Sequence, residues 1–154
     1  MKKIQLLLIM LLLFISVPCF AQQQRTDNQA IWDYCEEVRS VADPLTENML
    51  LMLNDGNYDQ YTRDFNKELK TAVPKAKFKE MDTAIKEKYG EYISKEFLNI
   101  EIHEKYIMTA YKGKFSKEKE PVLIRSVFVQ EAEKTYIAGF WLSPLKLVGN
   151  VNNQ

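Results

Sequence analysis

This chain of 154 residues has little of what most catalytic and metal-binding motifs require. It contains one histidine, His103, and two cysteines, Cys19 and Cys35. Metal sites and Ser–His or Cys–His catalytic groups need several such side chains at characteristic spacings, so neither is expected. The five glycines form no phosphate-binding loop and no Gly-x-Ser-x-Gly sequence. We therefore predict no catalytic residue, no metal ligand and no cofactor.

The chain also lacks an excess of charge of one sign. It carries 21 basic and 21 acidic residues, and these are mixed along most of its length. Nucleic-acid-binding surfaces and surfaces that bind anionic lipid depend on clustered positive charge. We therefore predict no nucleic-acid partner. A small-molecule ligand or a second copy of the chain remains the expected partner.

A hydrophobic segment stands at the N-terminus and is not repeated elsewhere. Lys2 and Lys3 precede an apolar run at 4–15, Pro18 follows, and Ala21 ends a pattern of small residues. This arrangement is typical of a secretory signal peptide. We predict a signal peptide at 1–21, cleaved after Ala21, and a secreted or periplasmic bacterial protein. It would meet the membrane only through the signal peptide during export.

Two other outcomes are open for the same segment. The uncleaved segment could hold the protein at the membrane as an anchor, or Cys19 could be lipidated. If cleavage occurs, Cys35 is the only cysteine that remains. No intrachain disulfide could then form. A buried structural thiol is the favoured interpretation of Cys35, and an intermolecular disulfide is the alternative.

Helical periodicity dominates the first half of the remaining chain. We expect an N-terminal helical extension at 22–42, and then either a second short helix or one kinked helix, because Asp43 resembles an N-cap and Pro44 a first helical residue. The apolar residues on this face recur at steps of three, four or seven: Ile31, Val38, Val41, Leu45, Met49 and Met52.

Two further helices are expected before residue 90. Asn57 and Gln60 form a capping-box pattern that opens the second helix, whose apolar positions are Tyr58, Tyr61, Phe65 and Leu69. The third helix carries Phe78, Met81, Ile85 and Tyr89, and Gly90 ends it.

After Gly90 the apolar residues alternate with a period of two. This predicts strands at 92–102, 106–115, 122–130 and 135–142, joined by short polar turns as antiparallel hairpins. The expected fold is α+β, with about three N-terminal helices packed on a curved four-stranded antiparallel sheet. The domain would span 43–145, followed by a disordered tail at 146–154.

The order of these elements resembles the nuclear transport factor 2-like superfamily, in which a cone of helices packs on a bent antiparallel sheet. The segment that carries the resemblance is 53–61, Leu-Asn-Asp-Gly-Asn-Tyr-Asp-Gln-Tyr. Its continuation through Phe65, Leu69, Lys77-Phe78, Tyr89-Gly90 and Ile137-Ala138-Gly139-Phe140-Trp141 fits the same plan. The nearest resemblance is to small secreted bacterial domains of unknown function. Members use this fold for enzymes, ligand pockets and dimers, so it does not select an activity.

The expected function is an exported, non-catalytic binding or interaction module. Its candidate ligand-binding residues are Arg125, Tyr106, Tyr111 and Trp141, because a guanidinium binds carboxylates and amphipathic aromatics line pocket mouths. The favoured interpretation of these residues is nevertheless that Arg125 is a solvated cross-strand partner of a glutamate, with Trp141 in ordinary packing.

The alternative function is a small pocket enzyme of isomerase or dehydratase type that uses tyrosine and carboxylate side chains in the cone. Two or more acids buried beside Tyr106 or Tyr111 would favour the enzyme. An apolar cavity would favour ligand binding. A filled cone with an exposed apolar sheet face would favour a dimer.

Overall fold

A computed structural model describes residues 19–145. The predicted signal peptide up to residue 18 and the predicted disordered tail at 146–154 lie outside the described residues. Contacts divide the chain into two units, Met1–Val38 and Arg39–Gln154. Within residues 19–145, no helix combines the length and the apolar character needed to cross a membrane.

The first described element is a single long helix, α2 (Cys19–Asn54), with Pro44 inside it. Of the two alternatives at Asp43-Pro44, the structure has one helix and not two, so the assignment of Asp43 as an N-cap is wrong. A proline removes one helical hydrogen bond. The residues around it are held by packing, since Ala42, Thr46 and Met49 are all buried. Tertiary contacts therefore keep α2 helical at Pro44, a residue type that interrupts isolated helices.

One helix carrying the apolar residues from Tyr58 to Leu69 was expected, and this prediction is wrong. The structure has two short helices instead, α3 (Tyr58–Tyr61) and α4 (Lys67–Ala72). Between them Phe65 forms an isolated parallel bridge with Ile137, and the Asn66 amide donates to the Ile137 carbonyl at 2.9 Å. Both Phe65 and Ile137 are buried. Long-range pairing of this segment therefore outweighs its helical period.

An asparagine side chain caps the N-terminus of each short helix. Asn57 caps α3 by accepting from the Gln60 amide, as the capping-box pattern predicted. Asn66 caps α4 in the same way, accepting from the Leu69 amide at 3.0 Å. Helix α5 (Lys75–Lys88) then buries Phe78 and is followed by Gly90 at φ +82°. The predicted third helix and its glycine terminator are confirmed.

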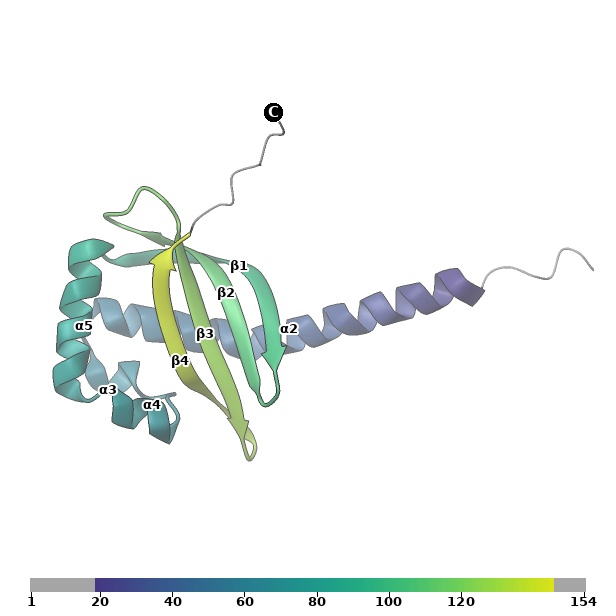
Figure 1. The fold of residues 1–154 in the computed structure, drawn as a ribbon, viewed down its shortest axis with the longest axis horizontal. Coiled ribbons are helices and arrows are strands. Elements are labelled where there is room, and N and C mark those ends of the chain that lie inside the picture. The colour runs from purple at the N-terminus through teal and green to yellow at the C-terminus, as the bar shows by residue number, and fades with distance from the viewer. Residues whose placement is uncertain (1–18, 146–154) are drawn as a thin grey trace, which may run out of the picture. The chain divides into compact units, whose positions relative to one another are not determined.

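The four predicted strands are present, within two residues of their expected ends. They are β1 (Tyr92–His103), β2 (Tyr106–Phe115), β3 (Val122–Glu131) and β4 (Lys134–Pro144). They form one open antiparallel sheet in the order β1-β2-β3-β4 (Figure 1). The α+β class is confirmed, with four helices among the described residues. Register shifts within β1 and between Val127 and Phe128 mark bulges, which bend strands.

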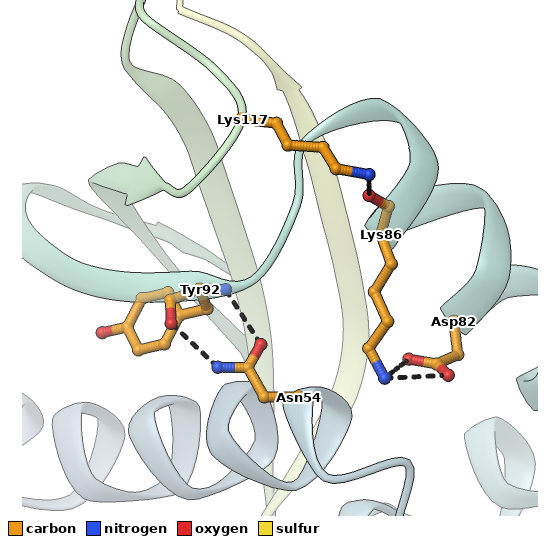
Figure 2. Close-up of polar contacts among 5 residues, drawn as sticks. All are labelled: Asn54, Asp82, Lys86, Tyr92 and Lys117. Carbon is orange, nitrogen blue, oxygen red and sulfur yellow. Dashed lines mark hydrogen bonds and ion pairs between the residues drawn. The ribbon is translucent and has the colours of Figure 1, made fainter.

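The start of the sheet is tied to the helices by polar side chains. The Asn54 side chain donates to the Tyr92 carbonyl and accepts from the Tyr92 amide, both at 2.8 Å, as a neighbouring strand would (Figure 2). On the other side, Lys117 Nζ donates to the Lys86 carbonyl at 2.9 Å (Figure 2). The Asn54 bonds fix where β1 begins relative to α2, and the Lys117 bond ties the loop after β2 to α5.

The two faces of the sheet differ sharply. The inner face, against which the second half of α2 packs, carries the buried side chains. The outer face carries charged residues and exposed aromatics. Thr46 of α2 donates to Ser126 of β3 at 3.1 Å in the interior, which identifies the inner face. The largest inner side chains with little or no exposure are Tyr111, Ile124, Phe128 and Ile137.

Candidate functional site

The strand register places the four predicted ligand-binding residues on two different faces. Arg125 lies opposite Ala110 on β2 and Trp141 on β4. Tyr106, four residues before Ala110, shares that outer face because side chains alternate along a strand. Tyr111 lies on the inner face and is only 1% exposed. Arg125, Tyr106 and Trp141 are therefore brought to one surface, and Tyr111 is not.

A groove of about 400 Å³ crosses this outer face. We call it the outer-face groove. Trp141 is 54% exposed and Tyr106 is 38% exposed, so both offer apolar surface to a ligand. Polar residues stand among its lining residues, which are Asn66, Glu68, Lys105, Tyr106, Val127, Val129, Glu131, Ala138, Gly139 and Trp141. An apolar groove with a few polar groups is typical of ligand sites.

The Trp141 ring lies over Gly139 of the same strand. A Cβ at residue 139 would come within 3.3 and 3.4 Å of the Trp141 ring atoms Cη2 and Cζ3. Because glycine has no side chain, the indole can lie along β4 instead of standing away from it. This places a broad aromatic surface beside the groove.

Arg125 stands next to this tryptophan without a partner among the described residues. No hydrogen bond, ion pair or ring contact involves it in residues 19–145, and it is exposed. Two other cations of the sheet are paired, Lys112 with Glu96 and Lys134 with Asp64. The interpretation of Arg125 as the cross-strand partner of a glutamate is therefore not what the structure has. Its guanidinium is available to an anion.

The inner face holds a second group of polar side chains, around Tyr111. The hydroxyls of Tyr111 and Thr109 are buried and form no hydrogen bond of acceptable geometry. Thr46 and Ser126, in contrast, bond to each other. Asp43 of α2 lies close enough to the Tyr111 hydroxyl to affect its ionisation. A buried hydroxyl without a partner is costly, and this one belongs to the most buried tyrosine of the chain.

Burial raises the pKa of Tyr111 above its ordinary value, and the Asp43 carboxylate raises it further, while the Thr109 hydroxyl acts in the opposite direction. Burial likewise raises the pKa of Tyr92, which donates to Glu47 at 2.7 Å. The pKa of Tyr61 rises because of burial and the nearby Asp82. At neutral pH these three hydroxyls are protonated. None of them is activated as a base.

These shifts predict the alkaline behaviour of the fold. Tyrosine in the unfolded chain ionises near pH 10, below its folded pKa, so stability is full below about pH 10 and falls as the pH rises further. Replacing Tyr111 with Phe removes one such group and an unsatisfied hydroxyl. We expect Tyr111→Phe to raise the free energy of unfolding by about 1 kcal/mol at neutral pH. Urea unfolding at several pH values should also show that the free energy of unfolding of Tyr111→Phe falls less steeply above about pH 10 than that of the wild type.

The control is Tyr136→Phe, on a tyrosine of β4 that is partly exposed. This substitution should leave both the neutral stability and its alkaline slope nearly unchanged. A Tyr111→Phe protein that is less stable than the wild type at neutral pH would show instead that the hydroxyl is well bonded.

Sequence reasoning did not select the floor of the outer-face groove. Val127, Val129 and Gly139 were taken only as strand residues. The alternation Arg125, Val127, Val129 along β3 could have placed them on one face. Their pairing with Gly139 and Tyr106 depends on the register and on the bulge at Val127. Only the folded sheet shows those two features.

Sequence comparison assigns the chain to a family. The profile of the family described as protein of unknown function (DUF3887) matches residues 46–140, which is more than half of the chain. The chain belongs to this family. The match runs from the second half of α2 into β4 and includes Arg125 and most of the groove, but it ends one residue before Trp141. No curated protein matches the sequence significantly.

Proposed function

We propose that this member of the family is an exported, non-catalytic binding module that uses the outer-face groove. Its ligand would have an apolar or aromatic body and a carboxylate. The observation that carries the proposal is the unpaired guanidinium of Arg125 beside the exposed indole of Trp141. The indole would contact the apolar body, and Arg125 would bind the carboxylate through two hydrogen bonds.

Two further parts of the proposal are the superfamily of the domain and its export. Membership of the nuclear transport factor 2-like superfamily is supported by the order of the elements and by the open antiparallel sheet. Export is supported by the apolar run after Lys2 and Lys3. The exported protein should begin at Gln22, and an intact mass that includes Met1, or a lipid mass on Cys19, would rule out cleavage after Ala21.

A thermal-shift screen of small aromatic and aliphatic acids tests the binding function. A ligand that binds only the native state raises the melting temperature by mass action. For the best ligand found, we expect Arg125→Ala and Trp141→Ala each to weaken binding about tenfold or more, because each removes a principal contact. Titration calorimetry on both variants gives the dissociation constants.

The matched control is Lys114→Ala. Like Arg125, Lys114 is an exposed cation that is not among the lining residues of the groove, but it lies opposite Ser94 of β1, whereas Arg125 lies opposite Trp141. The affinity of Lys114→Ala should equal that of the wild type. If Lys114→Ala and Arg125→Ala weaken binding equally, attraction is general and no groove site exists. If no acid shifts the melting temperature while neutral apolar compounds do, the carboxylate part of the proposal is wrong.

A pocket enzyme remains the second candidate, because the Tyr111 hydroxyl lies beside Asp43 in the interior. The Asp43 side chain is, however, 29% exposed and pairs with Arg39. Glu47, the next acid along α2, is 40% exposed. Neither is the fully buried carboxylate that such chemistry uses. If a catalytic activity is found, and Tyr111→Phe abolishes it while leaving ligand binding in the groove intact, the enzyme becomes the first candidate.

A further inference from the structure

The N-terminal half of α2 is amphipathic. Ile31, Cys35 and Val38 follow one another at steps of four and three, which places them on one line along the helix. We call this line the helix seam. Beyond the seam the same spacing continues at Ala42, Leu45 and Met49, but Ala42 and Met49 are buried in the core of the second unit and are not part of the seam. An apolar repeat of seven residues is the pattern of helices that pair with other helices.

Large apolar side chains on and beside the seam are exposed. Ile31 is 61% exposed, Trp32 is 68% exposed and Tyr34 is 41% exposed. Scattered surface apolar residues need no explanation. Three such residues within four positions of one helix do need one. The exposed patch indicates a surface that another molecule covers.

The charges favour a second copy of this chain over an anionic membrane. Asp33, Glu36 and Glu37 all lie on the side of the helix opposite the seam. Two identical helices could therefore meet along their seams without bringing these acids together. An anionic membrane is disfavoured, because interfacial helices carry Lys and Arg on their polar side. The seam has no charged residue that would select a different partner.

We propose that the helix seam pairs with the seam of a second copy of this chain, with the two Cys35 side chains facing each other. In that arrangement each seam residue meets its own counterpart, and Trp32 and Tyr34 flank the contact. The pairing is independent of the outer-face groove. It makes the protein a dimer through α2.

Sedimentation over a wide range of concentrations tests the pairing on the purified full-length protein as the cell produces it. We expect a concentration-dependent dimer. Ile31→Asp should raise its dissociation constant about tenfold or more. The matched control is Ala30→Asp, because residue 30 lies seven positions before Glu37 and so on the acidic side. It should leave the dissociation constant within about twofold.

Cys35 provides a second readout. Oxidised glutathione accepts two electrons and two protons from two Cys35 thiols, giving an intermolecular disulfide and two reduced glutathione molecules. We expect a disulfide-linked dimer for the wild type and none for Cys35→Ser. Asp33→Cys, placed in the Cys35→Ser background, puts the thiol on the acidic side and should not cross-link.

Four results would overturn the proposal. They are a monomer at every concentration, equal effects of Ile31→Asp and Ala30→Asp, equal cross-linking through residues 33 and 35, and a seam that binds neutral lipid vesicles instead of another copy. Circular dichroism during thermal unfolding checks that Ile31→Asp still folds. If Ile31→Asp does not fold, the comparison of cross-linking through Cys35 with cross-linking through Asp33→Cys tests the pairing instead. Neither Cys35→Ser nor Asp33→Cys adds a charge to the helix.

Discussion

Gly90→Ala is expected to lower the free energy of unfolding by about 3 kcal/mol, because it combines a disfavoured backbone conformation with a steric clash. Gly90 has φ +82°, where a Cβ is strained. A Cβ there would also lie 2.8 Å from the Lys117 amide nitrogen and closer still to Ser116 Oγ. Those are fixed atoms, since the Lys117 amide donates to the Tyr89 carbonyl and Ser116 Oγ accepts from the Glu91 amide.

Gly56→Ala is the matched control for this clash. Gly56 also has a positive φ, +64°, but the nearest atom to its added Cβ is Asp82 Oδ2 at 3.9 Å, an ordinary contact. Only the backbone strain remains, so we expect a loss of about 1 kcal/mol. Urea unfolding of both variants gives the comparison. Equal losses would mean that the loop at Ser116 and Lys117 moves away from the added Cβ at little cost. The contact of Lys117 with α5 in Figure 2 would then be flexible.

Phe128→Ala is expected to cost about 4 kcal/mol, the usual loss when a buried aromatic side chain is truncated. Phe128 points to the inner face of β3 and is 2% exposed. It pairs with Ile107 of β2 and Ile137 of β4, and its truncation would leave a cavity at the centre of the sheet. Thermal and urea unfolding measure the loss.

Trp141→Ala is the comparison on the opposite face of the sheet. Although the lost side chain is larger, we expect a cost of about 1 kcal/mol or less, because the indole is mostly in solvent. A small stability effect together with a large loss of ligand binding would place Trp141 in the site and outside the core. If Trp141→Ala destabilises the protein as much as Phe128→Ala, the indole serves packing, and the groove loses its main apolar contact.

Elements whose signals are local could be predicted from the sequence. Helix α5 has its apolar positions at helical steps and ends before Gly90, whose positive φ only glycine adopts without strain. The four strands have a period of two and are separated by short polar turns, which is enough to specify successive hairpins. Asn57 was correctly predicted to cap a helix because the capping bond reaches only three residues along the chain.

Elements decided by distant contacts could not be predicted in this way. Burial around Pro44 keeps α2 continuous where local preference would break it. Residues near Phe65 leave the helical conformation because they pair with Ile137, more than seventy residues later. In both places the burial of apolar surface outweighs local preferences worth about 1–3 kcal/mol.

The candidate site divides in the same way. The sequence by itself determined which residue types were available: one arginine within a strand, and tryptophan and tyrosine near it. Only the tertiary structure decided that Arg125, Trp141 and Tyr106 share the outer face while Tyr111 is buried on the inner face. The physical reason is the register: a strand sends alternate side chains to opposite faces, and pairing between strands decides which of them become neighbours.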